Sequence, residues 1–229
     1  MRFGVLVFPG SNCDHDTYHV VEALAKQPVT YLWHASEDLQ GCDAILVPGG
    51  FAYGDYPRTG AIAKFAPVMQ SVAKFAKSGG LVLGICNGFQ ILCEAHLLPG
   101  ALTRNSSLSF ICDRVFLRVE NASTPFTRAT KQGDVLRLPI KHGEGLYVAP
   151  EDELRQMEER GQVILRYVDA DGRETDAANP NGSMRAIAGV ANERFNIFGL
   201  MPHPEHAVEP MLGGEDGLKI FQSIAGSAR

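Results

Sequence analysis

The 229-residue sequence lacks the features that mark several classes of protein. No apolar run approaches the roughly 20 residues that a membrane-spanning helix needs, and Pro9-Gly10 interrupts the N-terminal apolar stretch too early for a signal peptide. Lys and Arg residues are not clustered, and the formal net charge is −5. The sequence therefore does not indicate a basic surface that binds the phosphates of nucleic acids. We therefore expect a cytoplasmic protein that binds neither membranes nor nucleic acid.

Cysteine is scarce and shows no pattern of close pairs. The odd number favours reduced thiols over a disulfide framework or a zinc site; the five are Cys13, Cys42, Cys86, Cys93 and Cys112. His15 and His19 have a spacing that can bind a metal on a helix, but their acidic and apolar neighbours favour surface and turn roles. His206, next to Glu205, would need further ligands that the sequence does not reveal. We expect no metal site.

Cys86 lies where an expected strand turns into a helix. The apolar run 81–83 precedes Gly84-Ile85-Cys86-Asn87-Gly88-Phe89-Gln90, in which glycines stand two residues before and two residues after the cysteine. Such glycines allow the sharp turn of a nucleophile elbow, here with sulfur in place of oxygen. The helix N-terminus would favour the thiolate, and the Asn87 amide could face an oxyanion. The alternative is a buried structural cysteine.

A possible base for this cysteine lies far downstream. The apolar run 197–201 leads into Pro202-His203-Pro204-Glu205. A histidine near the sulfur can accept its proton, and a carboxylate two residues later can orient the imidazole. Alone, this segment is more typical of an ordinary loop. Combined with the elbow, it predicts a Cys-His-Glu triad.

The remaining pattern predicts one α/β domain over residues 1–229. We expect strands at 3–8, 29–33 and 43–48 and helices at 14–26 and 67–77, an alternation that is typical of a parallel sheet. Gly50, Cys86 and His203 would then lie at the carboxyl ends of strands, where functional loops gather. The β-like runs 115–119, 135–140, 163–168 and 187–191 predict additional, partly antiparallel strands.

Three segments resemble the signatures of class I glutamine amidotransferases: Pro48-Gly49-Gly50-Phe51, the elbow at 84–90, and Pro202-His203-Pro204-Glu205. Four more are similar to those of the glutaminase subunits of phosphoribosylformylglycinamidine synthases, at residues 8–14, 53–56, 142–145 and 179–183. Together these segments extend over essentially the whole chain. The sequence departs from the family pattern at Pro57, where leucine is usual, and at Lys141, where alanine is usual.

The resemblance implies a flavodoxin-like fold, with a mostly parallel central sheet flanked by helices, and the hydrolysis of L-glutamine to glutamate and ammonia. Cys86 would attack the side-chain amide, His203 would transfer protons and Glu205 would orient His203. Backbone amides of Gly50 and Asn87 would form the oxyanion hole. For glutamine binding, the resemblance points to Gln90, Asn105, Ser107 and Phe110.

The sequence contains no G-x-x-x-x-G-K-[ST] loop, yet forming an amidine from an amide requires a phosphorylated intermediate. The resemblance therefore implies a separate synthetase subunit that binds ATP and magnesium and converts formylglycinamide ribonucleotide, together with a small bridging subunit. We expect no cofactor in this chain. The loop 51–58 is a candidate for contacting the synthetase.

Two alternative functions remain open at this point. One is a glutaminase or γ-glutamyl hydrolase of another pathway, against which the four additional segments argue. The other is a non-enzymatic redox protein on the same fold, against which His203 and Glu205 argue. Cys13 is interpreted as a turn residue, although it could be a second functional thiol. His142 and Glu144 are interpreted as accessory residues near the site.

Overall fold

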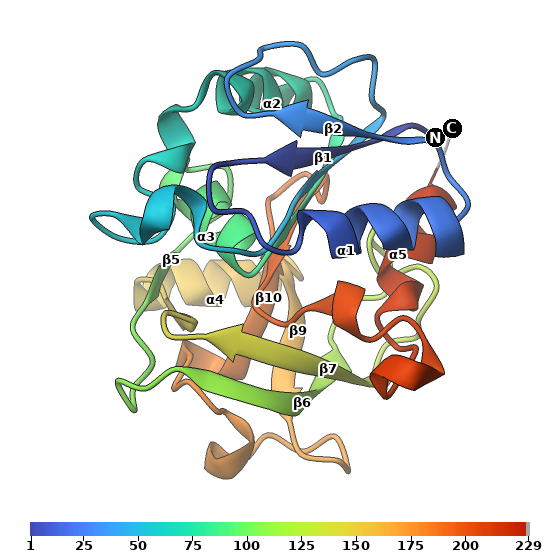
Figure 1. The fold of residues 1–229 in the computed structure, drawn as a ribbon. Coiled ribbons are helices and arrows are strands. Elements are labelled where there is room, and N and C mark those ends of the chain that lie inside the picture. The colour runs from blue at the N-terminus through green and yellow to red at the C-terminus, as the bar shows by residue number, and fades with distance from the viewer. Residues whose placement is uncertain (228–229) are drawn as a thin grey trace.

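A computed structural model, which describes residues 1–227, places nine strands in one sheet with helices on both faces (Figure 1). The strand order is β2-β1-β3-β4-β11-β10-β9-β6-β7. The first five strands in this order are parallel, and the remaining strands continue the sheet in antiparallel fashion. The predicted α/β fold with additional antiparallel strands is confirmed.

The parallel half contains β1 (Phe3–Val7), β2 (Val29–Trp33), β3 (Ala44–Val47), β4 (Leu81–Ile85) and β11 (Ile197–Leu200). Every residue of β3 and β11 is buried, whereas β2 at the sheet edge is mostly exposed or half-buried. Parallel strands covered on both faces need apolar residues on both sides, which explains why these segments have continuous apolar runs and little alternation.

The connections place helices on opposite faces. Helix α1 (Asp14–His19) joins β1 to β2 and continues as a π-helical turn (Val20–Leu24). Helix α2 (Pro67–Lys77) joins β3 to β4, and this connection runs across the sheet in the opposite direction. Because parallel crossovers are right-handed, these helices cover different faces. Helix α5 (Leu218–Ala225) contacts the π-helical turn, and α3 (Asn87–Glu94) packs on β4 and β11. The reversal of strand order between β1 and β3 creates a crevice at their carboxyl ends.

The antiparallel half contains β10 (Ile187–Ala191), β9 (Val163–Val168), β6 (Ile111–Val119) and β7 (Val135–His142). A separate two-stranded sheet pairs β5 (Ala101–Thr103) with β8 (Leu146–Val148), and helix α4 (Glu151–Glu159) follows β8. Strand β7 matters for the site because its last residues, Lys141 and His142, reach the carboxyl ends of the parallel strands.

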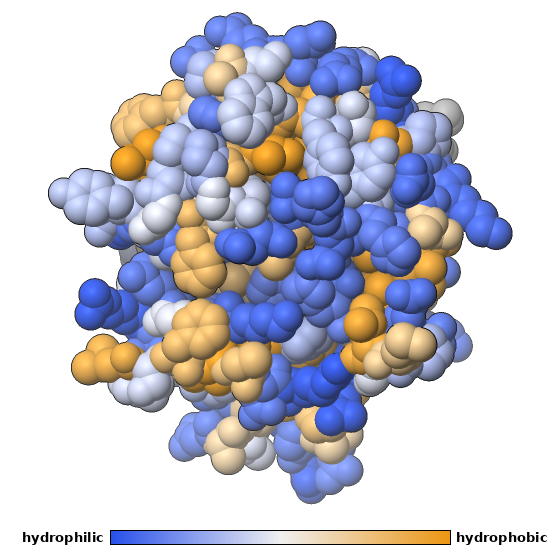
Figure 2. Space-filling model, in the orientation of Figure 1, coloured by the Kyte–Doolittle hydropathy of each residue, from blue (hydrophilic) through white to orange (hydrophobic). Residues whose placement is uncertain are grey.

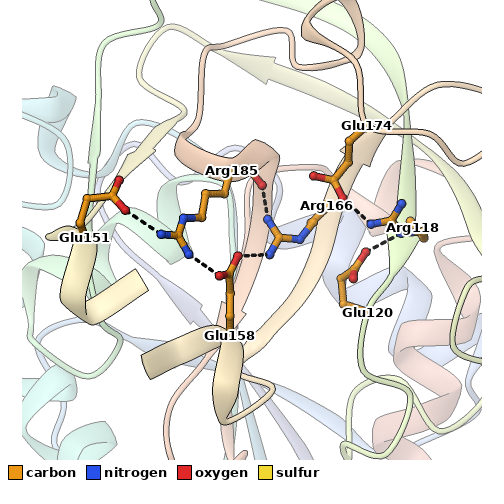
Figure 3. A network of polar contacts seen from close by, with 7 residues as sticks. All are labelled: Arg118, Glu120, Glu151, Glu158, Arg166, Glu174 and Arg185. Atoms are coloured by element: carbon orange, nitrogen blue, oxygen red, sulfur yellow. Dashed lines mark hydrogen bonds and ion pairs between the residues drawn. The ribbon is translucent and has the colours of Figure 1, made fainter. Parts of the chain in front are cut away.

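A network of charged side chains fixes α4 over β9 (Figure 3). Arg166 of β9 is 9% exposed, and its guanidinium lies 2.5 Å from the Glu158 carboxylate of α4. Glu158 also pairs with Arg185, which donates to Glu151 at 2.6 Å, so one carboxylate joins two guanidinium groups. A buried charge is costly unless it is paired, so removing Glu158 would leave Arg166 uncompensated. Figure 3 also includes Arg118 with Glu120 and Glu174.

The predicted element positions agree with the structure in the parallel half, where the helix over 67–77 and the strand over 29–33 have the predicted bounds. The first helix is shorter than predicted: it ends at Leu24, since the chain turns at Lys26, whose φ is 52°. The sequence analysis did not predict β5, β8, α4 or α5. Within residues 1–227, no helix is both long and apolar enough to cross a membrane.

Candidate active site

Cys86 occupies a sharp turn between β4 and α3. Its φ of 51° and ψ of −105° are rare for a residue with a side chain, and such strain is frequent at functional sites. Two neighbouring glycines make the turn possible. A Cβ on Gly88 would lie 1.8 Å from the carbonyl oxygen of Val47, and one on Gly84 would lie 2.8 Å from the Gly88 backbone. Helix α3 can approach β3 this closely only with glycine at position 88.

His203 and Glu205 follow β11 and form a buried pair. The His203 Nδ1 lies 2.6 Å from Glu205 Oε1, and the two residues are 2% and 1% exposed. Burial alone would lower the pKa of His203, but the Glu205 carboxylate and the neighbouring thiols of Cys86 and Cys13 hold it well above its ordinary value. Burial would raise the pKa of Glu205, but His203 holds it below its ordinary value. The pair therefore favours imidazolium with carboxylate.

Cys86 and His203 open onto one cavity of about 540 Å³ at the crevice. The Cys86 sulfur lies 3.7 Å from the carbonyl oxygen of Lys141 on β7. His203 Nε2 finds no hydrogen-bond partner among residues 1–227, which leaves this nitrogen free to exchange a proton. The structure thus brings together the three predicted triad residues, Cys86, His203 and Glu205.

The two predicted oxyanion-hole residues also lie at this place. Gly50 follows β3 and lines the cavity with φ of 149°, where a Cβ would lie 2.7 Å from the amide nitrogen of Asn12. Asn87 is the first residue of α3 and directly follows Cys86, so its amide belongs to the first turn, whose amides lack partners within the helix. Gly50 thus shares a cavity with Cys86, and Asn87 directly follows Cys86 in the chain.

The Asn87 side chain has a role that the sequence analysis missed. Its Oδ1 accepts from the Ala52 amide at 3.0 Å, and its Nδ2 donates to Asp55 Oδ1 at 3.2 Å and to Gln90 Oε1 at 3.0 Å. The side chain is buried, so these bonds are shielded from water. Asn87 therefore ties the cysteine elbow to the loop that follows Gly50.

Two carboxylates that interact with each other line the cavity. Asp55 and Glu144 both line it, and burial, followed by the charge of Glu144, raises the pKa of Asp55 to about 6. Glu144 is held by Thr59, whose hydroxyl donates to it at 3.0 Å, and by Gln90, whose Nε2 donates to the Glu144 carbonyl at 2.6 Å. A pair of acidic groups suits a cationic ligand. The sequence analysis could have indicated Asp55 and Glu144 as site residues, because they lie in the segments 53–56 and 142–145 that resemble the family.

The structure separates the four residues predicted to contact glutamine. Gln90 and Phe110 line the cavity, and Phe110 is 56% exposed. Asn105 is fully buried behind the cavity wall, and Ser107 is an exposed residue of the loop. Asn105 and Ser107 are therefore placed to shape the loop that carries Phe110, and they do not line the cavity.

His142 lines the cavity as a neutral side chain. Burial, followed by the charge of His203, lowers the pKa of His142 to about 4. Its Nδ1 lies 3.1 Å from Asn105 Oδ1, an acceptor, so Nδ1 carries the proton and Nε2 does not. Asn105 also donates to the His142 carbonyl at 2.8 Å. Asn105 thus orients His142, and the interpretation of His142 as a residue near the site fits its position.

Further side chains complete the wall beside His203. Cys13 comes from the turn after β1, and burial raises the pKa of its thiol although His203 opposes this effect. His206 lies 3.0 Å from Asp16 Oδ2 and 3.3 Å from Lys141 Nζ. The structure supplies, near His206, the metal-binding donors that the sequence did not reveal.

A cysteine elbow with a buried His-Glu pair, at the crevice of a doubly wound sheet, defines a class of α/β proteins with a potential thiol nucleophile. A family model described as a CobB/CobQ-like glutamine amidotransferase domain matches residues 1–213, and the chain belongs to this family. The resemblance to class I glutamine amidotransferases is thereby confirmed.

Several relatives match almost end to end. The chain is similar to phosphoribosylformylglycinamidine synthase subunit PurQ of Koribacter versatilis, with 59% identity over 99% of this chain and 98% of the relative. The PurQ subunit of Salinibacter ruber is 58% identical, over 97% and 95%. A chain in the structure of PurLQS from Thermotoga maritima is 48% identical, with a TM-score of 0.87 and coverage of 98% and 97%.

Proposed function

We propose that the chain is the glutaminase subunit of phosphoribosylformylglycinamidine synthase, which releases ammonia from L-glutamine for a synthetase subunit. The near-complete similarity to PurQ subunits supports this proposal. The observation that carries its chemistry is the buried His203–Glu205 pair, 2.6 Å between Nδ1 and Oε1, whose free Nε2 shares a cavity with the Cys86 thiol.

In the proposed reaction, His203 accepts the proton of the Cys86 thiol, and the sulfur forms a bond to the side-chain amide carbon of glutamine. His203 then delivers this proton to the departing nitrogen. The carbon–nitrogen bond breaks, and ammonia leaves a glutamyl thioester. Water then attacks the thioester while His203 accepts its proton, so glutamate departs and the thiol is restored. Glu205 accepts from Nδ1–H throughout, which keeps Nε2 as the nitrogen that exchanges protons.

The amides of Gly50 and Asn87 would donate to the oxyanion in both tetrahedral intermediates, and losing one such donor typically costs about 3 kcal/mol of transition-state stabilisation. Gln90 and Phe110 would contact the substrate. We assign the α-ammonium group of glutamine to Asp55 and Glu144, because these two carboxylates in the cavity wall match its charge.

The partner in this proposal is a synthetase subunit that carries ATP and magnesium, joined by a small third subunit in the cytoplasm, and this chain itself needs no cofactor. Phe51 and Tyr56, in the loop 51–58, are 51% and 74% exposed, and Phe65 is 73% exposed. Figure 2 shows hydrophobic patches among hydrophilic surface on the visible face of the molecule. We assign the loop 51–58 to contact with the synthetase.

The proposal predicts that the synthetase activates the glutaminase. A free glutaminase would release ammonia that is largely protonated, and therefore not nucleophilic, at neutral pH. Moving a competent state from 1:99 to 99:1 needs roughly 5.5 kcal/mol of preferential binding. We expect glutamate release to be slow for the isolated chain and much faster with the synthetase, its ribonucleotide substrate and ATP.

The control is a complex with Cys86→Ala, which should use added ammonia but not glutamine. Full glutaminase activity of the isolated chain, unchanged by the synthetase, would refute the coupling. Trapping a γ-glutamyl thioester by rapid quench and mass spectrometry separates this function from a redox protein. A chain that forms no thioester within the active complex would refute the hydrolytic role.

A further inference from the structure

Four side chains with metal-binding donors meet beside the cavity, and three of them line it, whereas Glu205 lies behind His203. Cys13, His203, Glu205 and His206 each offer one ligand atom, and these atoms all lie within 4.8 Å of one another. Cys13 comes from the turn after β1, and the other three come from the segment after β11. Residues this far apart in the sequence meet because β1 and β11 both end at the crevice.

Two of these side chains carry unpartnered polar atoms. Neither Nε2 of His203 nor Oε2 of Glu205 has a hydrogen-bond partner within the described chain, and the side chains are 3% and 0% exposed. The proposed reaction uses Nε2 of His203. It gives no role to Oε2 of Glu205 or to the Cys13 thiol. A buried carboxylate oxygen without a partner is costly, and a bound cation would satisfy it.

The donor set identifies the kind of metal. One thiolate, two imidazoles and one carboxylate form a set that zinc prefers, whereas magnesium and calcium require oxygen ligands. The two negative ligands would also balance the charge of Zn²⁺. Tetrahedral zinc places its ligand atoms roughly 3.5 Å apart, so donors now within 4.8 Å need to close by about 1 Å. His206 is partly exposed and has room to move.

Of the groups around His206, two carboxylates favour the binding of a metal and one ammonium group opposes it. Its Nδ1 faces Glu205, 3.6 Å from Oε1, and its Nε2 lies 3.0 Å from Asp16 Oδ2. This is the arrangement in which a carboxylate orients a histidine that binds metal through its other nitrogen. Lys141 opposes binding because its ammonium lies 3.3 Å from the same Nδ1. The Lys141 side chain is exposed, so it can turn away when a metal enters.

We propose that Cys13, His203, Glu205 and His206 form a reversible zinc site. Glu205 lies 2.6 Å from Nδ1 of His203, so zinc that is held by both residues replaces the Nδ1 proton. The imidazole then keeps its proton on Nε2, which can no longer act as a base, so zinc inhibits glutamine hydrolysis. The inhibition rests on the proposed function, whereas metal binding does not.

Cobalt(II) reports on this site directly, because a bound thiolate produces an intense charge-transfer absorption. The full chain, freed of metal with a chelator, is titrated with Co²⁺ and then with Zn²⁺ as competitor. We expect one equivalent to bind, with loss of the charge-transfer absorption in Cys13→Ser and its retention in Cys86→Ala. Cys112→Ser, which removes an exposed thiol, is the matched control and should bind as the unsubstituted chain does.

Two variants away from the protein core test the ligand set without relying on the buried cysteine. His206→Asn should weaken Co²⁺ and Zn²⁺ binding by at least about tenfold, and Lys141→Ala should tighten it. Absence of a charge-transfer absorption in the unsubstituted chain would overturn the proposal, as would its persistence in Cys13→Ser or its loss in Cys86→Ala. In the complex with the synthetase, the zinc concentration that halves glutamate release should be higher for His206→Asn than for the unsubstituted chain, and lower for Lys141→Ala. If both variants were as sensitive to zinc as the unsubstituted chain, inhibition through this site would be refuted.

Discussion

Replacing Glu205 by glutamine tests how the buried carboxylate supports His203. The Glu205 Oε1 accepts from Nδ1 at 2.6 Å, and Oε2 has no partner within residues 1–227. In Glu205→Gln, the amide has two orientations. If its oxygen faces Nδ1, its NH₂ group is buried without an acceptor. If its NH₂ group faces Nδ1, the proton of the imidazole moves to Nε2, which can then no longer act as a base.

The size of the effect follows from these orientations. Losing a hydrogen bond to a charged group costs about 1.5–3 kcal/mol, which corresponds to a rate reduced roughly 10- to 150-fold. Enforcing the wrong tautomer is more severe, and the equivalent change in a serine protease lowers kcat about 10⁴-fold. We therefore expect kcat to fall by about 10²- to 10⁴-fold. KM should change little, since Glu205 does not line the cavity.

Steady-state glutaminase activity with the synthetase measures this change, and the pH profile adds a second reading. Glu205 helps to hold the pKa of His203 well above its ordinary value, so its loss should move the alkaline limb of the profile to lower pH. His203→Ala should remove turnover, whereas Glu205→Gln should leave a measurable rate. Glu209→Gln, a partly exposed neighbour, is the matched control. A Glu205→Gln enzyme with kcat within about twofold of the unsubstituted one would refute the argument.

Three further outcomes are expected. A diazo-ketone analogue of glutamine should alkylate Cys86 and should still do so in Cys13→Ser; mass spectrometry that finds the label on another thiol would contradict this. Gly88→Ala should lower stability by about 3 kcal/mol or more, because its Cβ would lie 1.8 Å from a backbone oxygen of β3, whereas Gly143→Ala, with its nearest neighbour at 3.8 Å, should unfold at nearly the normal temperature. Asp55→Asn should raise the unfolding temperature above pH 6 and should weaken glutamine binding. The pKa of Asp55 is raised in the folded state, so the stabilisation from its protonated form is fully present below pH 3.8 and is lost as the pH rises through about 6. An equal stability difference at all pH values would contradict that assignment.

The sequence predicted those features that depend on local chemistry. The elbow could be recognised because two glycines flank Cys86 at fixed spacing, and the contact of Gly88 with β3 gives the physical reason for that spacing. The His203–Glu205 pair was also predictable, since only Pro204 separates the partners and both follow a buried strand. The parallel strands were visible as apolar runs bounded by turns.

Other features depend on contacts between distant segments and were not predictable. Asp55 and Glu144 lie in different loops, and only the folded chain places their charges together. Asn105 and Ser107 were assigned to substrate from the resemblance, yet the loop turns Asn105 inward toward His142. Helix α4 was missed because its residues are mostly charged and only Leu154 and Met157 are buried, which leaves a weak apolar periodicity.

The contacts of Asn87 connect the proposed partner surface to the proposed chemistry. The exposed loop 51–58 begins directly after Gly50, and within it the Ala52 amide and the Asp55 carboxylate both bond to the Asn87 side chain. Asn87 follows the nucleophile candidate and is bonded to Gln90. A synthetase that moves this loop would therefore act on Gly50, which directly precedes the loop, on the Asp55 carboxylate and on the elbow at the same time. Ala52, Asp55 and Gln90 all bond to the buried side-chain amide of Asn87. A displacement of the loop therefore also affects Gln90 and the elbow, so a single docking event can change the competence of the whole site.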